Sequence, residues 1–303
     1  MIKPKMIIAG GTGFCGKALQ QHFANKYELF VLTRTPNCKN HIKWDGKTLT
    51  NWVNIIDGAE VLINLTGRIV DCRYNKKNKG QILNSRIDST SVLSKAMKGL
   101  EKPPKVWINA STATIYRHTV GDKAANTERG GVIGSMNNFS ESVALRWEAE
   151  FFSENIDGLR KVALRTAIVL GKQGGAFPVM YKLANWGLCT PQASGMQWIS
   201  WIHINDFCRS VEHVIRNKKV EGVINICTPK PVTNRNFNAY LKQKCRPIFT
   251  LPQPKFLLEI GAFFMRTETE LILKSRKVFP EKLIESGFDF KYPSIQKCLD
   301  DLI

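Results

Sequence analysis

The sequence is short of acidic residues. It has 25 Asp and Glu against 44 Lys and Arg in 303 residues, which gives a formal net charge of +19 at pH 7. The basic residues are scattered, with modest clusters only at 73–79, 216–219 and 274–282. This distribution argues against nucleic acid as the main ligand and favours a general positive field that attracts anionic metabolites. A lysine-rich composition without functional meaning stays an alternative.

Long apolar runs and paired cysteines are also missing. No apolar run reaches the roughly 18 residues of a membrane-spanning helix, and Met1 leads through a short basic stretch directly into the apolar residues 6–9, without a signal-peptide pattern. The eight cysteines form no C-x-x-C pair and no metal-ligand spacing with histidine. We therefore expect reduced, buried thiols, no metal, no membrane partner and a cytoplasmic location.

Apolar runs of strand length alternate with helix-like stretches over most of the chain. The runs lie at residues 6–9, 29–32, 61–65, 106–110, 162–170 and 223–227, and the helix-like stretches at 16–25, 89–99, 140–152 and 206–216. This alternation predicts an α/β fold with a doubly wound parallel sheet of the Rossmann type. Pro-punctuated helical segments follow at 256–265, 268–274 and 280–286. We therefore expect an α/β domain at 1–230 and a smaller, mainly helical lobe at 231–303.

A glycine-rich loop follows the first apolar run and leads into a helix-like segment. Residues 10–16 fit both G-x-G-x-x-G and G-x-x-G-x-x-G, and a second strand ends about 20 residues further on. Glycines allow the backbone to approach a pyrophosphate closely, and the free N–H groups of the following helix favour an anion. The loop therefore predicts dinucleotide binding, and we expect Gly13 to need a positive φ as well. The residues expected to contact the dinucleotide are Gly10, Gly11, Thr12, Gly13, Phe14 and Gly16.

The same loop nearly fits the phosphate-binding motif G-x-x-x-x-G-K-[ST]. Position 18 is Ala, however, so the Ser or Thr hydroxyl that would bind Mg²⁺ is missing. The sequence therefore does not favour a nucleoside triphosphatase.

The second apolar run ends in Leu32-Thr33-Arg34. A protein that prefers NAD usually places Asp or Glu here against the ribose 2′-hydroxyl. An arginine suits a 2′-phosphate instead, through charge-assisted hydrogen bonds. Arg34 therefore predicts NADP rather than NAD, and a purely surface role for Arg34 stays open.

Beyond these motifs, nearly the whole chain resembles the extended short-chain dehydrogenase/reductase superfamily. It is most similar to the NADP-binding, epimerase-like family whose members carry a C-terminal domain of unknown function. The matching segments are 10–16, 33–34, 44–45, 64–67, 85–86, 165–171, 197–203, 231–234, 276–283 and 287–293. The resemblance implies a Rossmann domain that binds NADP, with further cofactor contacts at Thr33, Leu65, Thr66, Gly67, Gln81, Arg86 and Ile168. For Leu65 and Ile168 plain strand packing is the alternative, and for Arg86 a solvated cation.

The superfamily's chemistry normally rests on a Ser or Thr, a Tyr and a Lys four residues after that Tyr. The helix expected to carry the Tyr and the Lys contains neither over residues 140–148. The literal pair Tyr240 and Lys244 lies outside any matching motif, and we interpret it as accidental. Ser111 and Tyr116 lie just past the fourth apolar run, where the hydroxyl belongs, so we predict that they take part in any turnover. A turn cap at Ser111 and packing at Tyr116 are the alternatives.

Four further residues are secondary candidates. His203 and Asp206 lie in a segment that resembles the one lining the substrate side in the superfamily. We interpret Asp206 as a helix cap and His203 as a partly buried, hydrogen-bonded histidine. Trp147 is expected to pack. Glu148 is an outside candidate for acid/base work.

Together these patterns predict an NADP-binding oxidoreductase or sugar-nucleotide-epimerase-like enzyme. A small-molecule substrate of unknown identity is expected between the sheet and the C-terminal lobe. The missing Tyr-Lys pair leaves a second hypothesis open, a non-catalytic NADP-sensing or regulatory protein with a link to cell division. A third hypothesis, a nucleic-acid-associated protein, rests on the net charge alone, and a homodimer is an open expectation.

Overall fold

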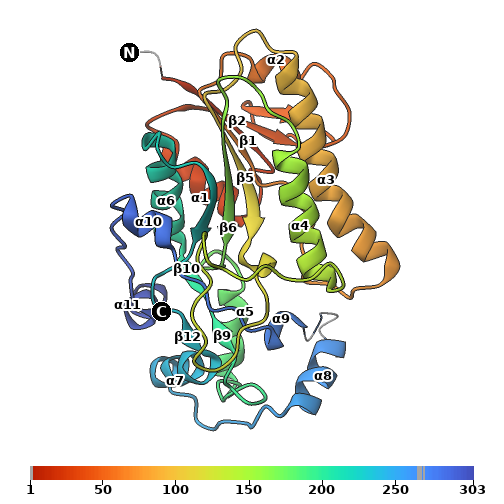
Figure 1. The fold of residues 1–303 in the computed structure, drawn as a ribbon. Helices are drawn as coiled ribbons and strands as arrows, with labels where there is room; N and C mark the ends of the chain where they lie inside the picture. Colours follow the sequence, from red (N-terminus) through yellow and green to blue (C-terminus); the bar gives the residue numbers. More distant parts are fainter. Residues whose placement is uncertain (1–2, 265–267, 269) are drawn as a thin grey trace.

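A seven-stranded parallel sheet forms the centre of the computed structural model, which describes residues 3–264, 268 and 270–303 (Figure 1). The strand order is β11-β6-β5-β4-β1-β2-β3, and every neighbouring pair is parallel. The strands are β1 (Lys5–Ala9), β2 (Glu28–Thr33), β3 (His41–Lys43), β4 (Val61–Asn64), β5 (Val106–Thr112), β6 (Arg160–Thr166) and β11 (Gly222–Ile226). The predicted α/β fold with a doubly wound parallel sheet is confirmed.

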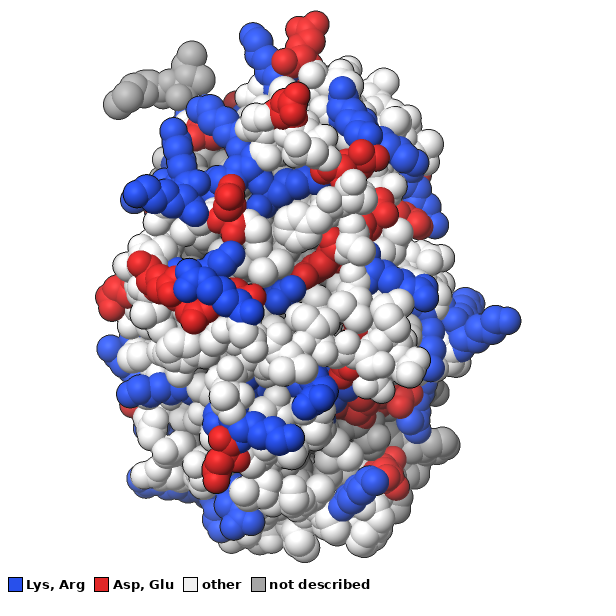
Figure 2. All heavy atoms as spheres, in the orientation of Figure 1, with Lys and Arg blue, Asp and Glu red and all other residues white. Residues whose placement is uncertain are grey.

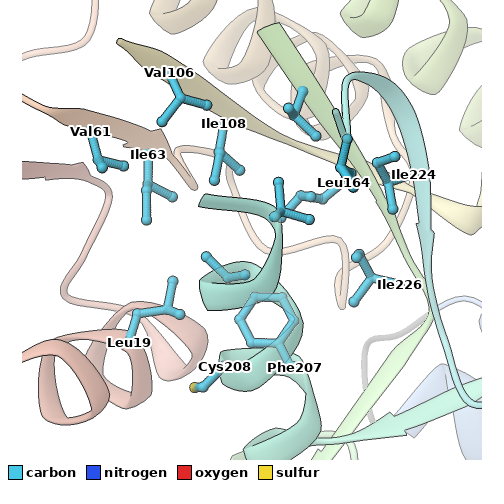
Figure 3. Packing of buried hydrophobic residues seen from close by; sticks show 14 of the residues in the cluster. Leu19, Val61, Ile63, Val106, Ile108, Leu164, Phe207, Cys208, Ile224 and Ile226 are labelled. Carbon is cyan, nitrogen blue, oxygen red and sulfur yellow. The ribbon is translucent and has the colours of Figure 1, made fainter. Parts of the chain in front are cut away.

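Helices cover both faces of this sheet. One face packs against α1 (Phe14–Phe23) and α6 (Ile204–Arg216), and the other against α2 (Val53–Ile56), α3 (Lys76–Lys98) and α4 (Phe139–Phe152). Because successive strand residues point to opposite faces, Ile8 belongs to the first core cluster and Ile7 to the second. Figure 3 shows the first cluster, in which side chains of α1 and α6 lie against those of β4, β5, β6 and β11.

A second, smaller layer of structure lies beyond the carboxyl ends of the strands. It contains a three-stranded sheet, a two-stranded sheet and three helices that share one hydrophobic cluster. Its elements are β7 (Ile168–Gly171), β8 (Gly174–Gly175), β9 (Trp198–Ile199), β10 (Trp201–His203), β12 (Val232–Thr233), α5 (Phe177–Asn185), α7 (Asn234–Cys245) and α11 (Ile295–Leu302). The remaining elements are η1 (Ala113–Ile115), α8 (Lys255–Phe264), α9 (Glu270–Leu273) and α10 (Glu281–Glu285).

Some predicted boundaries differ from the observed ones. The apolar run 162–170 is two strands, because β6 ends at Thr166 and β7 joins a different sheet. Helix α3 begins at Lys76, well before the predicted start at Ser89. The predicted helix 256–265 corresponds to α8, and its last residue lies outside the described residues.

The core joins residues from both sides of the predicted boundary at residue 230. Leu283 is fully buried in the first core cluster, together with Phe288. Asn225 Nδ2 of β11 donates a hydrogen bond of 3.0 Å to the carbonyl of Phe279. The boundary stays a prediction, but the last segment of the chain clearly returns to pack against the central sheet.

The charge distribution agrees with a scattered pattern of cations. On the face drawn in Figure 2, Lys and Arg are spread among acidic and uncharged side chains rather than gathered in one stripe. Within the described ranges, no helix is both long and apolar enough to cross a bilayer.

Candidate functional site

The glycine loop between β1 and α1 is held by close backbone contacts. Gly10 has a φ of 72°, and a Cβ atom there would lie 2.9 Å from the backbone N of Thr66. A Cβ atom at Gly16 would lie 2.4 Å from the carbonyl oxygen of Gly11. Only glycine fits at Gly10 and Gly16, so the fold itself requires these two residues.

Gly13 differs from its neighbours because the protein leaves space beside it. Its φ is −76°, so the expectation of a positive φ at Gly13 was wrong, and the positive φ belongs to Gly10. A Cβ atom at Gly13 would have one neighbour within 4 Å, the carbonyl oxygen of Gly10 at 3.8 Å. Gly13 is also the N-cap of α1, whose first turn carries no acidic residue. The start of α1, next to the exposed Gly13, therefore presents free N–H groups beside an open backbone position, as an anion site requires.

Thr12 and Phe14 have different environments in the loop. Thr12 is exposed at the tip of the loop. The half-buried ring of Phe14 packs on Gly171, Gly174 and Gly175, where added Cβ atoms would lie 2.7 to 3.1 Å from ring carbons. Phe14 thus fixes the loop against the β7–β8 hairpin.

The end of β2 presents two cations. Thr33 is buried, whereas Arg34 is exposed. Lys43 Nζ of β3 donates a 2.8 Å hydrogen bond to the carbonyl of Arg34, which brings a second cation beside it. Among the described residues no carboxylate pairs with the guanidinium of Arg34. An anion could therefore bind both cations without displacing an existing ion pair.

The end of β4 carries a buried hydroxyl without a partner. The backbone N of Leu65 donates to Ala9 O at 2.9 Å, which continues the pairing of β4 with β1, and its half-buried side chain packs against the core. Thr66 N donates to Asn64 Oδ1 at 3.0 Å, but Thr66 Oγ1 is buried without a hydrogen-bond partner in the described structure. Buried polar atoms are nearly always paired, so this hydroxyl is free to bind a ligand atom.

Arg86 of α3 lies beside Gly67 in the same region. A Cβ atom at Gly67 would lie 3.1 Å from Arg86 Cζ, and the guanidinium stacks over Trp147 at 5.1 Å from the ring centroid. Burial lowers the pKa of Arg86 to about 10. Arg86 donates only to backbone carbonyls, those of Ile82 and Arg68, and within the described ranges no carboxylate pairs with it. A partly buried cation without a carboxylate favours a nearby anion.

The last two predicted cofactor residues lie at the edges of this region. Gln81 is exposed on α3 and accepts a hydrogen bond from Arg68. Ile168 is half-buried at the start of β7 and packs with the cluster of the second layer. The opposite end of β7, Gly171, contacts Phe14 of the glycine loop.

Ser111 and Tyr116 belong to one buried hydrogen-bond network. Ser111 Oγ donates to Glu148 Oε1 at 2.5 Å, and Arg165 binds the same carboxylate through Nε at 2.9 Å and Nη2 at 2.7 Å. Arg165 Nη1 donates to the hydroxyl of Tyr116 at 3.0 Å, and that hydroxyl donates to Asn225 Oδ1 at 2.8 Å. Strand pairing explains the arrangement, because Ser111 of β5 lies directly opposite Arg165 of β6.

The burial of this network bears on the predicted chemistry. Tyr116 has 0% and Ser111 5% of its surface exposed. Burial raises the pKa of Tyr116, although the charge of Arg165 opposes the shift. Burial alone would lower the pKa of Arg165, but the hydrogen bonds and charge of Glu148 raise it above its ordinary value. The geometry therefore supports a structural role for both hydroxyls and does not support direct contact of Tyr116 with a substrate.

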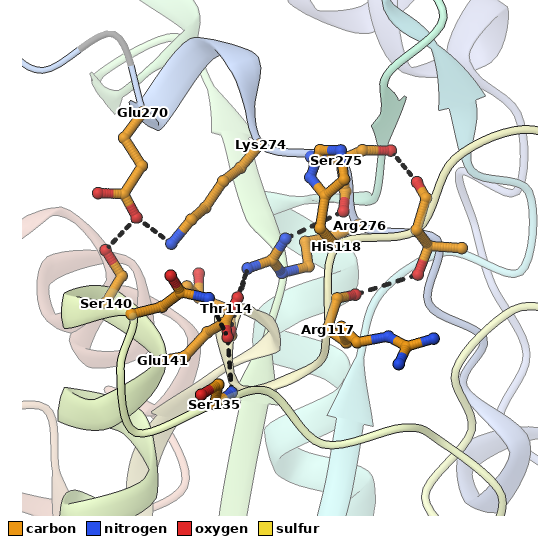
Figure 4. Close-up of polar contacts among 12 residues, drawn as sticks. Thr114, Arg117, His118, Ser135, Ser140, Glu141, Glu270, Lys274, Ser275 and Arg276 are labelled. Atoms are coloured by element: carbon orange, nitrogen blue, oxygen red, sulfur yellow. Dashed lines mark hydrogen bonds and ion pairs between the residues drawn. The ribbon is translucent and has the colours of Figure 1, made fainter.

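A second polar cluster lies where η1, the start of α4 and the segment 270–276 meet (Figure 4). Ser140 Oγ donates to Glu270 Oε1 at 2.8 Å, and Glu270 forms an ion pair with Lys274. Arg276 Nη2 donates to Glu141 Oε1 at 2.9 Å in a buried ion pair. The C-terminal part of the chain thus binds α4 through one buried ion pair, Arg276–Glu141, and one hydrogen bond, Ser140–Glu270.

Two further groups border this cluster. His118 Nδ1 accepts a 3.1 Å hydrogen bond from Ser275 N, and burial together with the charges of Arg276 and Lys274 lowers the pKa of His118. The ring of Tyr74 packs edge-on against Phe139 at the start of α4. Burial raises the pKa of Tyr74 to about 12, while its hydrogen bond with Ser140 opposes the shift.

Sequence reasoning did not select the members of this cluster. The basic stretch 274–282 and the residues that open α4 were both visible in the sequence, but nothing in it places them side by side. Asn109 and Asn64, which bond to each other at 2.8 Å between neighbouring strands, were likewise missed.

The secondary candidates take structural positions, but the expectation that Asp206 caps the helix was wrong, because Asp206 accepts from the backbone N of Lys291 and Tyr292. His203 is the N-cap of α6, and its Nδ1 accepts from Asn205 N at 3.1 Å. Trp147 packs under Arg86, and Glu148 is the buried partner of Arg165. Lys244 of α7 forms an ion pair with Asp300 of α11, so its charge already has a partner within the second layer. Within the described residues no group of three or more His, Cys, Asp or Glu could hold a metal ion.

Comparison with known families gives this geometry a context. The sequence profile of the NAD dependent epimerase/dehydratase family matches residues 6–227, which is most of the chain. This chain belongs to that family. A second profile, that of a domain of unknown function (DUF1731), matches residues 253–302 of this epimerase-family chain. The predicted resemblance to an epimerase-like family with such a C-terminal domain is confirmed.

Relatives of full length are known from distant organisms. The epimerase family protein SDR39U1 of Homo sapiens is 27% identical over 303 residues, which cover 99% of each chain. The epimerase family protein YfhF of Bacillus subtilis is 30% identical over 310 residues, covering 98% of this chain and 97% of YfhF. The similarity thus extends over both matched regions.

Solved structures share the fold. The crystal structure of human SDR39U1 (isoform2) with NADPH superposes with a TM-score of 0.86 at 27% identity and covers 98% of both chains. The nucleoside-diphosphate sugar epimerase of Corynebacterium glutamicum gives a TM-score of 0.80 at 25% identity, covering 99% of this chain and 58% of that one.

Proposed function

We propose that this epimerase-family chain binds NADP at the carboxyl ends of β1, β2 and β4 and acts on a small molecule as an oxidoreductase or epimerase-like enzyme. One observation carries the proposal: close backbone contacts require glycine at Gly10 and Gly16, whereas no protein atom near Gly13 explains why that position is glycine. A backbone position kept open beside a helix N-terminus is what a pyrophosphate needs. The human relative crystallised with NADPH supports the same cofactor.

The residues present fit this cofactor. Gly10, Gly11, Thr12 and Gly13 and the first turn of α1 would hold the diphosphate, with Phe14 and Gly16 fixing the loop. Arg34, beside Thr33 and assisted by Lys43, would hold the 2′-phosphate. The unpaired hydroxyl of Thr66 and the carboxylate-free guanidinium of Arg86 fit polar parts of the same ligand. Leu65, Gly67, Gln81 and Ile168 complete our set of proposed contacts.

The substrate side is formed by the cluster around Ser140. Bound NADP would supply the hydride acceptor or donor of an oxidoreductase. Ser140 donates a hydrogen bond to Glu270, which forms an ion pair with Lys274, and these groups can hold or move a proton at the Ser140 hydroxyl. We further propose that residues 1–230 bind the nucleotide and that 231–303 complete the substrate side, since Glu270 and Lys274 come from the later part.

The predicted roles of Ser111 and Tyr116 are narrowed by their burial. We propose that both act by positioning: Ser111 and Arg165 orient Glu148, and Tyr116 ties Arg165 to Asn225. The next hydroxyl along β5, on Thr112, is half-buried and caps η1 by accepting from Thr114 N at 3.1 Å. Thr112 is therefore the better-placed hydroxyl of β5 for contact with a substrate.

A non-catalytic NADP sensor is the second candidate function. The observation in its favour is that α4 carries no Tyr-Lys pair, while Tyr116 is fully buried. Binding of NADP without any turnover would support this candidate.

The experiment has two arms. Isothermal calorimetry with NADPH measures cofactor binding, and a screen of alcohols, ketones and sugar nucleotides, read by NADPH absorbance, measures turnover. We expect Lys274→Met to lower turnover at least ten-fold with NADPH affinity unchanged, and the exposed control Lys297→Met to behave as wild type. Unchanged turnover in Lys274→Met would contradict the assigned substrate side, and no NADPH binding at all would contradict the proposed function.

A further inference from the structure

The end of the molecule formed by α5, α7 and α8 carries a group of exposed apolar side chains. Figure 1 places these helices at the end of the chain's fold opposite α2. Ile248 is fully exposed, and Phe249 and Phe256 expose about three-fifths of their surfaces (61% and 60%). We call this group the apolar end, and its members are Trp186, Ile248, Phe249, Leu251, Phe256 and Leu257. Large side chains exposed together mark an interaction surface rather than chance exposure.

Hydrogen bonds connect the two segments that carry these residues. Leu251 N donates to Gly187 O at 3.0 Å, and Thr190 Oγ1 donates to Leu251 O at 2.6 Å. Phe249 lies directly against Gly187, so its ring is next to the residue that follows Trp186. Helix α8 begins immediately afterwards, where Leu257 N donates to Pro254 O at 3.0 Å. The exposed side chains therefore belong to segments that are hydrogen-bonded to the rest of the fold.

The charge around the apolar end has one sign. The stretches 158–205 and 222–258, which build α5, α7 and the start of α8, contain eleven Lys and Arg and not one Asp or Glu. Lys182 Nζ lies 4.9 Å from the centre of the Trp186 ring. The other cations on these helix ends and the linking segment are Lys242, Lys244, Arg246 and Lys255. Lys244 pairs with Asp300, and Lys255 lies 3.9 Å from Glu259, so Lys182, Lys242 and Arg246 remain for an external anion.

Exposed apolar side chains together with cations favour one class of partner over another. A nucleic acid would use the cations but gains little from protruding aliphatic side chains. A surface of anionic lipids uses both, because aromatic and aliphatic groups enter the interface while Lys and Arg bind the headgroups. Helix α8 has ten residues, or about 15 Å of length, which is half of what a span requires, so it can only lie in the plane of the interface.

We propose that the apolar end docks this protein on membranes that carry anionic lipids. Trp186, Ile248 and Phe249 enter the headgroup boundary, with α8 lying alongside, and Lys182, Lys242 and Arg246 bind lipid phosphates or carboxylates. The glycine loop lies on the far side of the second layer and takes no part in docking. Docking is therefore separable from NADP binding.

The test is co-sedimentation of the full chain with vesicles. Vesicles of phosphatidylcholine alone are compared with vesicles in which a third of the lipid is phosphatidylserine, at low salt and at 0.5 M NaCl. We expect binding to the anionic vesicles only, and its loss at high salt. The double variant Ile248→Ser/Phe249→Ser should weaken binding at least ten-fold, while Leu49→Ser, an equally polar change at an exposed apolar residue elsewhere, should not. The charge variant Lys242→Glu/Arg246→Glu should weaken binding similarly.

Two controls keep the outcome clear. Thermal melting shows that the variants fold, and NADPH calorimetry should give wild-type affinity in all of them. Equal binding of wild type and Ile248→Ser/Phe249→Ser, or no binding to anionic vesicles, would overturn the proposal. So would two other results: retention on duplex DNA that the charge variant alone abolishes with no lipid binding, or a dimer in sedimentation velocity that the apolar variant dissociates. These would assign the surface to nucleic acid or to a second copy of the chain.

Discussion

The Glu148 carboxylate explains why two predicted catalytic hydroxyls are buried. It accepts three hydrogen bonds, one from Ser111 and two from Arg165, within a distance range of 2.5 to 2.9 Å. A buried carboxylate needs such partners, since an unpaired buried charge costs several kcal/mol. Ser111 and Tyr116 are therefore committed to holding this ion pair between β5, β6 and α4. Chemistry at the site has to use other hydroxyls.

We expect the preference for NADP over NAD to depend on Arg34. A charged hydrogen bond contributes roughly 1.5 to 3 kcal/mol, so Arg34→Ala should weaken NADP binding about ten-fold to a hundred-fold and leave NAD nearly unchanged. Calorimetry with both cofactors measures this difference. The control is Lys105→Ala, which should change neither affinity, because Lys105 is an exposed cation just before β5, at the amino ends of the strands. Equal losses for NADP and NAD in Arg34→Ala would remove the assignment.

A substitution at Gly13 should affect cofactor binding without affecting folding. Its φ of −76° suits any residue and an added Cβ meets nothing closer than 3.8 Å, so Gly13→Val should fold with a melting temperature near that of wild type. The valine side chain would fill the space of the pyrophosphate, and NADPH binding should be lost. Gly16→Val is the matched comparison, because its Cβ would lie 2.4 Å from Gly11 O and should prevent folding. A folded Gly13→Val protein with wild-type NADPH affinity would show that the loop is not the phosphate site.

At the scale of elements, α6 depends on a histidine cap. His203 is 1% exposed, and its Nδ1 accepts from Asn205 N. Burial lowers the pKa of His203, against the opposing charges of Asp301 and Asp206. Because the folded pKa lies below that of the unfolded chain, the unfolded state binds more protons as the pH falls through about 6.5. The stabilising contribution of neutral His203 is thus full above that pH and is lost as the pH falls through the folded-state pKa.

His203→Asn should therefore flatten the pH dependence of stability. Asn caps helices well but does not titrate near neutral pH. Urea unfolding at pH 7.5, 6.5 and 5.5 should show a smaller loss of stability on acidification in the variant than in wild type. His41→Asn, on the edge strand β3, serves as the control and should keep the wild-type slope. A wild-type slope in His203→Asn would contradict the role of this cap.

The elements that the sequence predicted well are those whose apolar patterns are local. The runs 6–9, 61–65 and 223–227 became β1, β4 and β11 nearly residue for residue, because buried parallel strands are continuous apolar runs. The first half of α3 was missed because Lys76, Lys77 and Gly80 give it no apolar stripe. Its helical state depends on an Asn75 cap and on contacts with α4, which no local pattern contains.

The same distinction applies to the candidate site. The glycine loop and Arg34 are contiguous motifs, so their positions could be read from the sequence. The cluster around Ser140 joins this residue to Glu270 and Lys274, and Glu270 lies 130 positions further along the chain. The burial of Ser111 and Tyr116 follows from the pairing of β5 with β6. This pairing sets the direction of each side chain, and the local sequence does not reveal it.

On the scale of the whole molecule, the last segment of the chain is part of the central core. Leu283 is fully buried in the first core cluster, so Leu283→Ala should lower the free energy of unfolding by about 3 kcal/mol. Its neighbour Ile284 is 41% exposed, and Ile284→Ala should change stability by less than about 1 kcal/mol. Chemical denaturation measures both values. If both substitutions changed the free energy of unfolding by less than about 1 kcal/mol, the last segment of the chain would be only loosely attached to the core.

The return of residues 278–290 to the sheet also has a consequence for synthesis. Leu283 covers apolar surface that β11 and α6 leave open, Val278 packs against Ile115 of η1, and Asn225 of β11 donates a hydrogen bond to the carbonyl of Phe279. During synthesis, the central sheet therefore cannot reach its final packing until residues 278–290 have left the ribosome exit tunnel. A premature stop codon just before residue 278 would consequently give a product that exposes core surface to quality-control proteases, even though the glycine loop and the seven strands of this sheet had been translated.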